Sequence, residues 1–168
     1  MSTWAPVWTI IKSHESAGRL RRLIPRSVDL PLRRPIFLRH ELHRTLFGEQ
    51  TSAEDTARYM ALRARLEMFI GDEVIASSYM KPLVPYRNGV WEILNKKPNP
   101  SLRVFGLFAT RDVFIGTHHQ LRSALGSFST PMWKDEIRRA RHEWDQLFEG
   151  IDPVVGKLHE VISGATYV

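Results

Sequence analysis

The sequence predicts one α+β domain of two layers: a strand, a helical hairpin, an antiparallel three-stranded meander and C-terminal helices. Three observations support this class. The chain of 168 residues has the length of a single domain. Short apolar segments separated by turn residues follow one another in residues 89–117. Segments with the apolar spacing of helices stand on both sides of that region.

The N-terminal segment is predicted to be a strand followed by a long loop. Residues 6–12, PVWTIIK, are β-branched and aromatic, which favours a short strand. Residues 13–35 carry prolines at positions 25, 31 and 35, and proline interrupts a helix. We therefore expect a basic loop insertion there, with one short helix at residues 16–24.

A helical hairpin is predicted next. In residues 36–48 leucines recur one helical turn apart before a terminal glycine, at Leu38, Leu42, Leu46 and Gly48. The second helix is predicted from residue 51 and ends at Gly71; its first turn offers two capping pairs, Thr51 with Glu54 or Ser52 with Asp55. The short link between the two helices predicts antiparallel packing.

The meander is predicted from three apolar segments, residues 89–94, 102–109 and 113–117. Both faces of the middle strand are apolar, which indicates that it is covered on both sides. Arg103 is the exception, and its charge requires a partner or an opening to water.

The last third is predicted to be helical. Thr130 and Pro131 provide an N-cap followed by proline in the first turn, and apolar residues recur at helical spacing up to Phe148. A further helix is expected from Asp152 to Gly164. The single domain, 1–168, is thus divided into the insertion at 13–35, a core at 36–148 and a C-terminal helix within 149–168.

The positive charge of the chain is concentrated near its start. The net charge is +6 over all residues. Up to Gly48 there are nine Lys/Arg and three Asp/Glu, 9 − 3 = +6, so the remainder is neutral. Such a basic arm attracts phosphate backbones or an acidic protein, and the alternative is a solvated segment that aids solubility.

The composition also restricts the class of protein. The chain has no cysteine, which excludes disulfides, thiolate nucleophiles and Cys-type zinc sites. No apolar run reaches the roughly 18 residues of a membrane span, and the first residues do not follow the pattern of a signal peptide. We expect a cytoplasmic protein without a membrane partner.

The order of elements and several short motifs resemble the RelE/ParE toxin superfamily, in particular its HigB-like branch. The matching segments are VWTIIK, MKPLVPYRNGVWEIL, LRVFGLF, DVFI and STPMWKDEIRRA. The similarity spans about residues 50–148 and the first predicted strand. The positions that carry it are Leu83, Gly89, Trp91, Glu92, Arg103, Thr130, Pro131, Glu136, Ile137 and Ala140.

The resemblance implies a toxin of a toxin–antitoxin or prophage module. Members similar to RelE and HigB cleave mRNA on the ribosome without a metal, whereas ParE-like members inhibit DNA gyrase. Both are held by an antitoxin, for which the resemblance suggests a helix-turn-helix protein. Leu94 stands where the family often has a basic residue. The segment LGSFS replaces a Lys-Lys pair. These departures favour the alternative of a non-catalytic protein that retains the fold and binds nucleic acid or protein.

Metal-independent RNA cleavage requires a base, an acid and cations around the phosphate. Arg103 is the expected phosphate ligand, and His118 or His119 the expected proton-transfer group, because histidine titrates near neutral pH. Additional RNA contacts are expected from residues near them in sequence: Lys81, Arg87, Trp91, Lys96, Lys97, Arg111 and Arg122. No cofactor and no metal ion are expected.

Each candidate has a structural alternative. On a strand His118 and His119 point to opposite faces, so only one can join Arg103; the preferred pairing is His119 with Arg122 three residues later. Alternatively, both histidines end a strand at its wet edge. Arg103 is about as well explained by an ion pair with Glu92. The pair His40 and His43 lacks a third ligand and is assigned to a helix surface.

Overall fold

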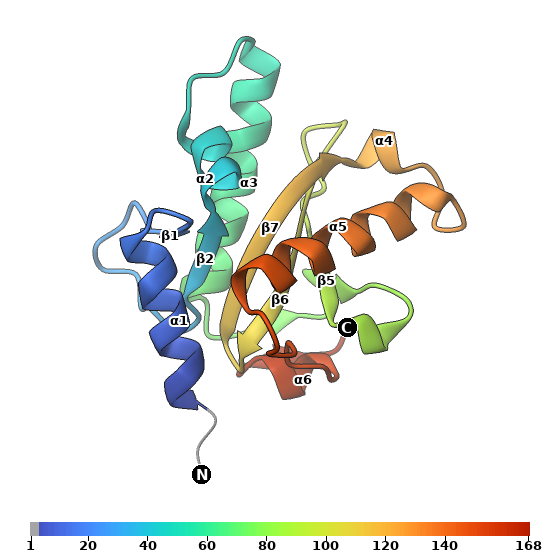
Figure 1. Ribbon diagram of the computed structural model, residues 1–168. Helices are drawn as coiled ribbons and strands as arrows, with labels where there is room; N and C mark the ends of the chain where they lie inside the picture. The colour runs from blue at the N-terminus through green and yellow to red at the C-terminus, as the bar shows by residue number, and fades with distance from the viewer. Residues whose placement is uncertain (1–3) are drawn as a thin grey trace.

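The computed structural model, which describes residues 4–168, is built around one six-stranded sheet. Its strand order is β1-β2-β7-β6-β5-β4 (Figure 1). All neighbours are antiparallel except β2 and β7. The strands of the sheet are β1 (Leu20–Arg22), β2 (Ile36–Arg39), β4 (Met80–Pro82), β5 (Val90–Leu94), β6 (Leu102–Thr110) and β7 (Val113–Leu121).

Helices surround the sheet, and a small parallel pair of strands lies apart from it. That pair joins β3 (Ile75–Ala76) to β8 (Ala165–Thr166). The helices are α1 (Trp4–Ser16), α2 (His40–Phe47), α3 (Ala53–Gly71), α4 (Arg122–Leu125), α5 (Pro131–Leu147), α6 (Leu158–Val161) and the 3₁₀ turn η1 (Tyr86–Asn88). Within residues 4–168 no helix combines the length and apolar character required to cross a membrane.

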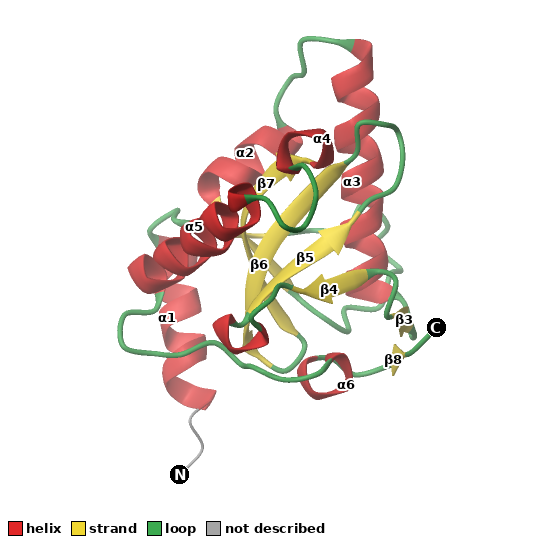
Figure 2. Cartoon of the chain, turned by 90° about the vertical axis from the view of Figure 1, so that its right-hand side faces the viewer, coloured by secondary structure: helices red, strands yellow, loops and turns green. Residues whose placement is uncertain are grey.

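Both faces of the sheet are covered, so the molecule has three layers and the prediction of two layers is wrong. Phe105 and Leu107 of β6 belong to a core shared with α1 and α5. Val104 and Phe108 belong to a second core shared with α2 and α3. Figure 2 shows the sheet between α5 and α3. The apolar residues on both faces of β6 require this arrangement, because each face must be covered.

The three-stranded meander is present, since β5, β6 and β7 are consecutive antiparallel neighbours. A bulge interrupts the pairing of β6 with β7. Phe105 lies opposite His118 and Gly106 opposite Gly116, so Thr117 is an extra residue in β7. Gly106 is required there, because a Cβ at this position would lie 2.3 Å from the carbonyl oxygen of Ile115.

The first predicted strand is wrong, because residues 6–12 belong to the helix α1. Val7, Ile11 and His14 recur at helical spacing and are buried. The His14 Nε2 donates to the carbonyl oxygen of Leu147, 2.6 Å away, which fixes α1 against α5. Packing of this stripe outweighs the local β preference of the sequence.

The predicted helix at residues 16–24 is also absent. Gly18, at φ 73°, follows the end of α1, and Leu20–Arg22 form the edge strand β1. Ile36–Arg39 form β2 instead of the first turn of a helix. The predicted hairpin therefore starts at α2, four residues later, and the Leu38 assigned to its stripe is a strand residue.

The other helix predictions differ in outcome. The second predicted helix is α3, which ends at Gly71 as predicted, and Ser52 caps it by accepting from the Asp55 N–H at 3.1 Å. Helix α5 starts at Pro131 as predicted, although the Thr130 hydroxyl donates to Leu125 O instead of capping. The C-terminal helix is reduced to α6, because residues before it lie extended along the sheet, with Val154 N donating to Phe108 O.

Candidate nucleic-acid interface

The candidate site lies at one end of the sheet, where β5 ends, β6 begins and β7 passes into α4. We call this place the Arg122 end. The Arg122 N–H donates to the Ser101 carbonyl at 2.8 Å, which holds the start of β6 against the start of α4. Arg103 and the exposed Lys96 and Lys97 of the β5–β6 loop lie at the same end of the sheet. Four of the predicted cations thus meet in one region.

Arg103 is buried, and its Nη1 and Nε face partners within the protein. Its Nη1 donates to the Asn95 carbonyl, to Ser101 Oγ at 3.0 Å and to the Leu102 carbonyl at 3.3 Å. Its Nε lies 3.3 Å from a carboxylate oxygen of Glu92. The ion pair considered as the structural alternative is therefore present, and Arg103 links strands β5 and β6.

Glu92 is 1% exposed and is surrounded by cations. Burial raises its pKa, and the charges of Arg103, Lys81 and Arg122 act against that increase. Three cations around one carboxylate leave an excess of positive charge. An anion that approaches the Arg122 end therefore meets a favourable potential.

Removing Arg103 is expected to destabilise the protein through the carboxylate left behind. We expect Arg103→Met to lower the free energy of unfolding by about 1–2 kcal/mol, less than for an isolated buried pair because the charges of Lys81 and Arg122 still act on Glu92. The double variant Arg103→Met/Glu92→Leu should recover most of that loss, since it removes both charges. Urea denaturation of the three proteins measures this. Equal losses in the single and double variants would contradict a structural pair.

Aromatic side chains complete the Arg122 end. The Phe128 ring stacks on the Trp133 ring with centroids 4.8 Å apart. The Arg122 guanidinium lies 5.5 Å from the centre of each ring. Phe128 is 65% exposed, and the buried Trp133 Nε1 has no hydrogen-bond partner among the described residues. The cluster therefore presents an exposed aromatic ring and one cation, with an unpaired donor buried beneath them.

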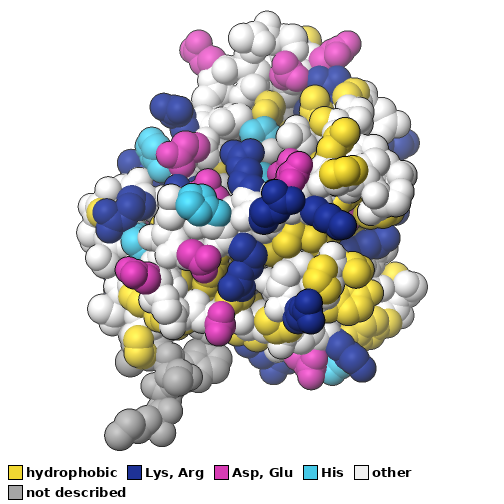
Figure 3. Space-filling model, turned by 45° about the vertical axis from the view of Figure 1, so that its right-hand side comes forward, with side chains coloured by type: hydrophobic (Ala, Val, Ile, Leu, Met, Phe, Trp, Pro, Cys, Tyr) yellow, Lys and Arg dark blue, Asp and Glu magenta, His cyan; other side chains and the backbone are white. Residues whose placement is uncertain are grey.

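Two hollows border this cluster. One of about 200 Å³ is lined by Lys81, Glu92, Phe128 and Trp133 together with Pro82, Leu83, Val84 and Ile137. The second, of about 330 Å³, is lined by residues 99–101, Arg122 and Ser123. Figure 3 shows Lys and Arg side chains gathered on the side of the molecule that carries α5, with exposed hydrophobic side chains beside them. Cations and apolar surface are the combination that phosphates and bases require.

His118 lies on the same sheet face as Arg103 but is closed off by α5. It is 3% exposed and its ring stacks on Phe105 at 4.9 Å. Its Nε2 is 2.5 Å from a Glu136 carboxylate oxygen, and its Nδ1 is 2.9 Å from Thr117 Oγ1. Burial lowers the pKa of His118, although the hydrogen bond to Glu136 opposes this. The imidazole is fully engaged in attaching β7 to α5.

Glu136 is the partner of His118 on α5. Burial acts to raise its pKa, but the hydrogen bond with His118, the charge of His118 and a hydrogen bond with Gln120 outweigh burial, and the net pKa is lowered. A carboxylate is therefore retained beside the imidazole. This pair holds the helix on the sheet and leaves no room for a phosphodiester between them.

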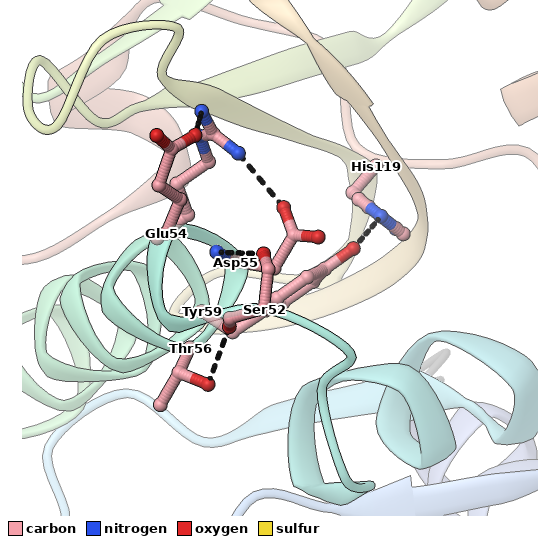
Figure 4. A network of polar contacts seen from close by, with 7 residues as sticks. Ser52, Glu54, Asp55, Thr56, Tyr59 and His119 are labelled. Carbon is pink, nitrogen blue, oxygen red and sulfur yellow. Dashed lines mark hydrogen bonds and ion pairs between the residues drawn. The ribbon is translucent and has the colours of Figure 1, made fainter.

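His119 lies on the sheet face opposite to that of His118 and Arg103, so the preferred pairing of His119 with Arg122 is wrong. Its Nε2 accepts from the Tyr59 hydroxyl of α3 at 2.8 Å, as Figure 4 shows. Burial, followed by the charges of His118 and Arg139, lowers the pKa of His119 to about 4. The bulge at Thr117 is the physical reason, because one extra residue exchanges the faces of the two histidines.

Three further candidates lie away from the Arg122 end. Trp91 is 2% exposed and packs edge-on against Phe108 in the core under α3. Arg111 lies in the β6–β7 turn, and eight residues of extended strand separate it from Arg103 by roughly 26 Å. Its Nη2 donates to the carbonyls of His159 and Ile162. Arg87 in η1 precedes β5 and is exposed at that same distant end.

The histidines of α2 do not complete a metal site. Within residues 4–168 no three side chains of the His, Asp or Glu type lie close enough to hold a metal ion. The His43 ring instead stacks on Phe47 with centroids 4.4 Å apart.

Several residues of the site are missed by sequence reasoning. Phe128 has a recognisable signal, since it is a single aromatic residue between serines in a loop before a helix. Asn95, Thr117 and Tyr59 have none, because their roles depend on pairings that only the folded chain creates. No known protein family, curated protein or solved structure matches this chain.

Proposed function

We propose that the protein binds single-stranded RNA at the Arg122 end and does not cleave it. The main support for this proposal is one cluster of side chains. In it Arg122 lies beside the stacked rings of Phe128 and Trp133, next to a hollow that Lys81 lines. A base can stack on the open face of Phe128, and Arg122 and Lys81 can hold adjacent phosphates. Stacking on aromatic side chains beside cations is the common mode of single-strand recognition.

The geometry supports binding more than catalysis. A general base must come within about 3 Å of the 2′-hydroxyl from which it takes the proton. His118 is covered by Glu136, His119 faces the other side of the sheet, and Arg103 is engaged by Glu92 and backbone carbonyls. Of the two functions that the sequence leaves open, the non-catalytic one therefore requires no rearrangement.

The endoribonuclease remains the second candidate because of one observation. His118 and Arg103 lie on one sheet face, opposite Phe105 and Gln120 respectively. Cleavage by these residues would require α5 to move away with Glu136. A toxin of the RelE or HigB kind acts on mRNA at the ribosome, so either candidate fits the resemblance, with an antitoxin as a further proposed partner. Gyrase inhibition is the alternative outcome, in which the protein leaves RNA unaffected and changes the topology of DNA.

RNA binding at the Arg122 end is tested with a fluorescently labelled single-stranded RNA of mixed sequence and fluorescence anisotropy. We expect Phe128→Ala to weaken binding by about tenfold, because base stacking contributes about 1–3 kcal/mol. Arg122→Ala should weaken it further and reduce its salt dependence. Arg87→Ala, an exposed arginine at the distant end, is the matched control and should change the Kd less than twofold.

The same samples separate the candidates. RNA recovered after incubation should be intact on a denaturing gel. RNA cut by the wild type and spared by His118→Ala would establish the nuclease instead. Absence of binding at low salt, or an equal loss in the Arg87→Ala control, would contradict the proposed interface.

A further inference from the structure

A second basic surface lies at the other edge of the sheet, around β1 and α2. The arm cations divide into two groups. Arg26 pairs with Glu67, Arg39 with Glu143, and Arg34 is buried. Six exposed cations form no ion pair with another described residue: Lys12, Arg19, Arg21, Arg22, Arg33 and Arg44. Two of them donate hydrogen bonds instead, Arg19 to His14 Nδ1 and Arg33 to the Gly71 carbonyl. The free part of the basic arm is therefore concentrated on α1, β1 and α2.

Helices α2 and α3 add a fixed stack to this surface. The His43 ring covers one side of Phe47, with centroids 4.4 Å apart and planes inclined by 17°. The Arg63 guanidinium of α3 lies 4.1 Å from the centre of the same ring. Arg63 is also 3.5 Å from Glu67, which is shared with Arg26. The guanidinium and the imidazole are thus held by Phe47 and need not be ordered when an anion binds.

Strand β1 brings a further cation to the stack. Arg21 pairs with Leu38, whose side chain lies in the core under α2, so Arg21 is on the α2 side of the sheet. Burial lowers the pKa of His43, and the charges of Arg21, His40 and Arg63 lower it further. Cations therefore surround His43. The two nearby acids already have cationic partners, since Glu41 is close to Arg39, and Glu67 is close to Arg26 and Arg63.

We infer that the surface formed by Arg21, His43, Arg44 and Arg63, which we call the β1–α2 surface, binds the phosphate backbone of double-stranded nucleic acid. The His43 ring and the Arg63 guanidinium both lie against the Phe47 ring, so little of it is left for a base to stack on. An acidic protein would require an apolar anchor at the centre of its interface, and Phe47 is only 37% exposed. Guanidinium groups without an aromatic platform fit phosphates of any sequence.

This surface is independent of the Arg122 end. β1 and β4 are the two edges of the sheet, and the Arg122 end lies toward β4. Single strands are expected at the open Phe128 ring and duplex at the β1–α2 surface. The inference goes beyond the proposed function, and either site can be correct without the other.

The test uses the full chain and a blunt-ended RNA duplex of about 18 base pairs, which offers no unpaired base. In Arg21→Gln/Arg44→Gln we expect the Kd to rise about five- to tenfold at low salt. The slope of log Kd against log salt should fall by about 1.8, because each lost phosphate contact contributes about 0.9. Arg87→Gln/Arg138→Gln changes the charge equally at exposed positions elsewhere and should change the Kd less than twofold.

Two comparisons make the result decisive. The variant Arg122→Ala/Phe128→Ala should bind the duplex as the wild type does. If this variant loses only single-strand binding, the inference about the β1–α2 surface is unaffected. Arg63→Gln, measured only if its urea denaturation matches the wild type, should weaken duplex binding. An unchanged salt slope in Arg21→Gln/Arg44→Gln overturns the inference, as does displacement of the duplex by poly-glutamate at lower concentration than by unlabelled duplex.

Discussion

Replacing Arg34 with alanine is expected to lower the free energy of unfolding by about 3–5 kcal/mol, the largest effect predicted for this chain. Arg34 is fully buried. It donates to the carbonyl oxygens of Phe69, Asp72 and Ser163 and lies 5.5 Å from the centre of the Phe69 ring. It therefore ties the segment before β2 to the end of α3 and to the C-terminal segment. Alanine would leave three acceptors without a donor and a cavity beside Phe69.

Urea denaturation followed by circular dichroism measures this loss. Arg33→Ala provides the matched control. Its neighbouring guanidinium is exposed and donates to one carbonyl, that of Gly71, at 3.2 Å. We expect a change below about 1 kcal/mol there. Similar losses in the two variants would contradict the role assigned to Arg34.

Acidification from pH 7 to pH 4.5 is expected to remove about 2–3 kcal/mol of stability through His119. Its pKa is about 4 in the folded protein against 6.5 as the ordinary value. The unfolded chain therefore takes up the proton first, so the contribution is complete above the unfolded pKa and is lost as the pH falls toward the folded one. The Tyr59 hydroxyl, which donates to the neutral Nε2, loses its acceptor when His119 is protonated.

The pH dependence is measured by urea denaturation at several pH values. His119→Gln, which cannot be protonated, should have a clearly shallower dependence than the wild type. Some dependence should remain, because burial also lowers the pKa of His118 and His43, and both act in the same direction. His142 is an exposed histidine on α5, and the variant His142→Gln should show the same pH dependence of stability as the wild type. A wild-type slope in His119→Gln would contradict the buried, neutral state of His119.

The sequence predicts the elements whose local and tertiary preferences agree. The capped helix α3, the amphipathic helix α5 and the strands β5 to β7 each combine the correct periodicity with terminal signals. At α1 the two preferences conflict. Residues 6–12 have β-branched side chains, but Val7, Ile11 and His14 are buried together only in a helix.

The candidate site is predicted in part. Arg103 and Arg122 meet because the ends of antiparallel strands must lie together, which short-range patterns are sufficient to indicate. The placement of the histidines depends on one extra residue at Thr117, and no local signal in the sequence marks that bulge. A regular ladder would have put His119 beside Arg103. A shift of one residue in the register therefore decides which histidine lies under α5, on the face of Arg103, and which lies under α3.

Single-stranded RNA is proposed to lie on the Arg122 end. This placement is tested most directly by NMR of ¹⁵N-labelled protein titrated with a short single-stranded RNA. We expect shifts of the Trp133 indole N–H, which has no partner among the described residues, and of the amides of residues 122–130. The Trp144 indole, which donates to the Ile151 carbonyl at 2.7 Å, should not move. If the Trp133 signal is unchanged at saturating RNA while signals elsewhere shift, RNA does not bind at the Arg122 end.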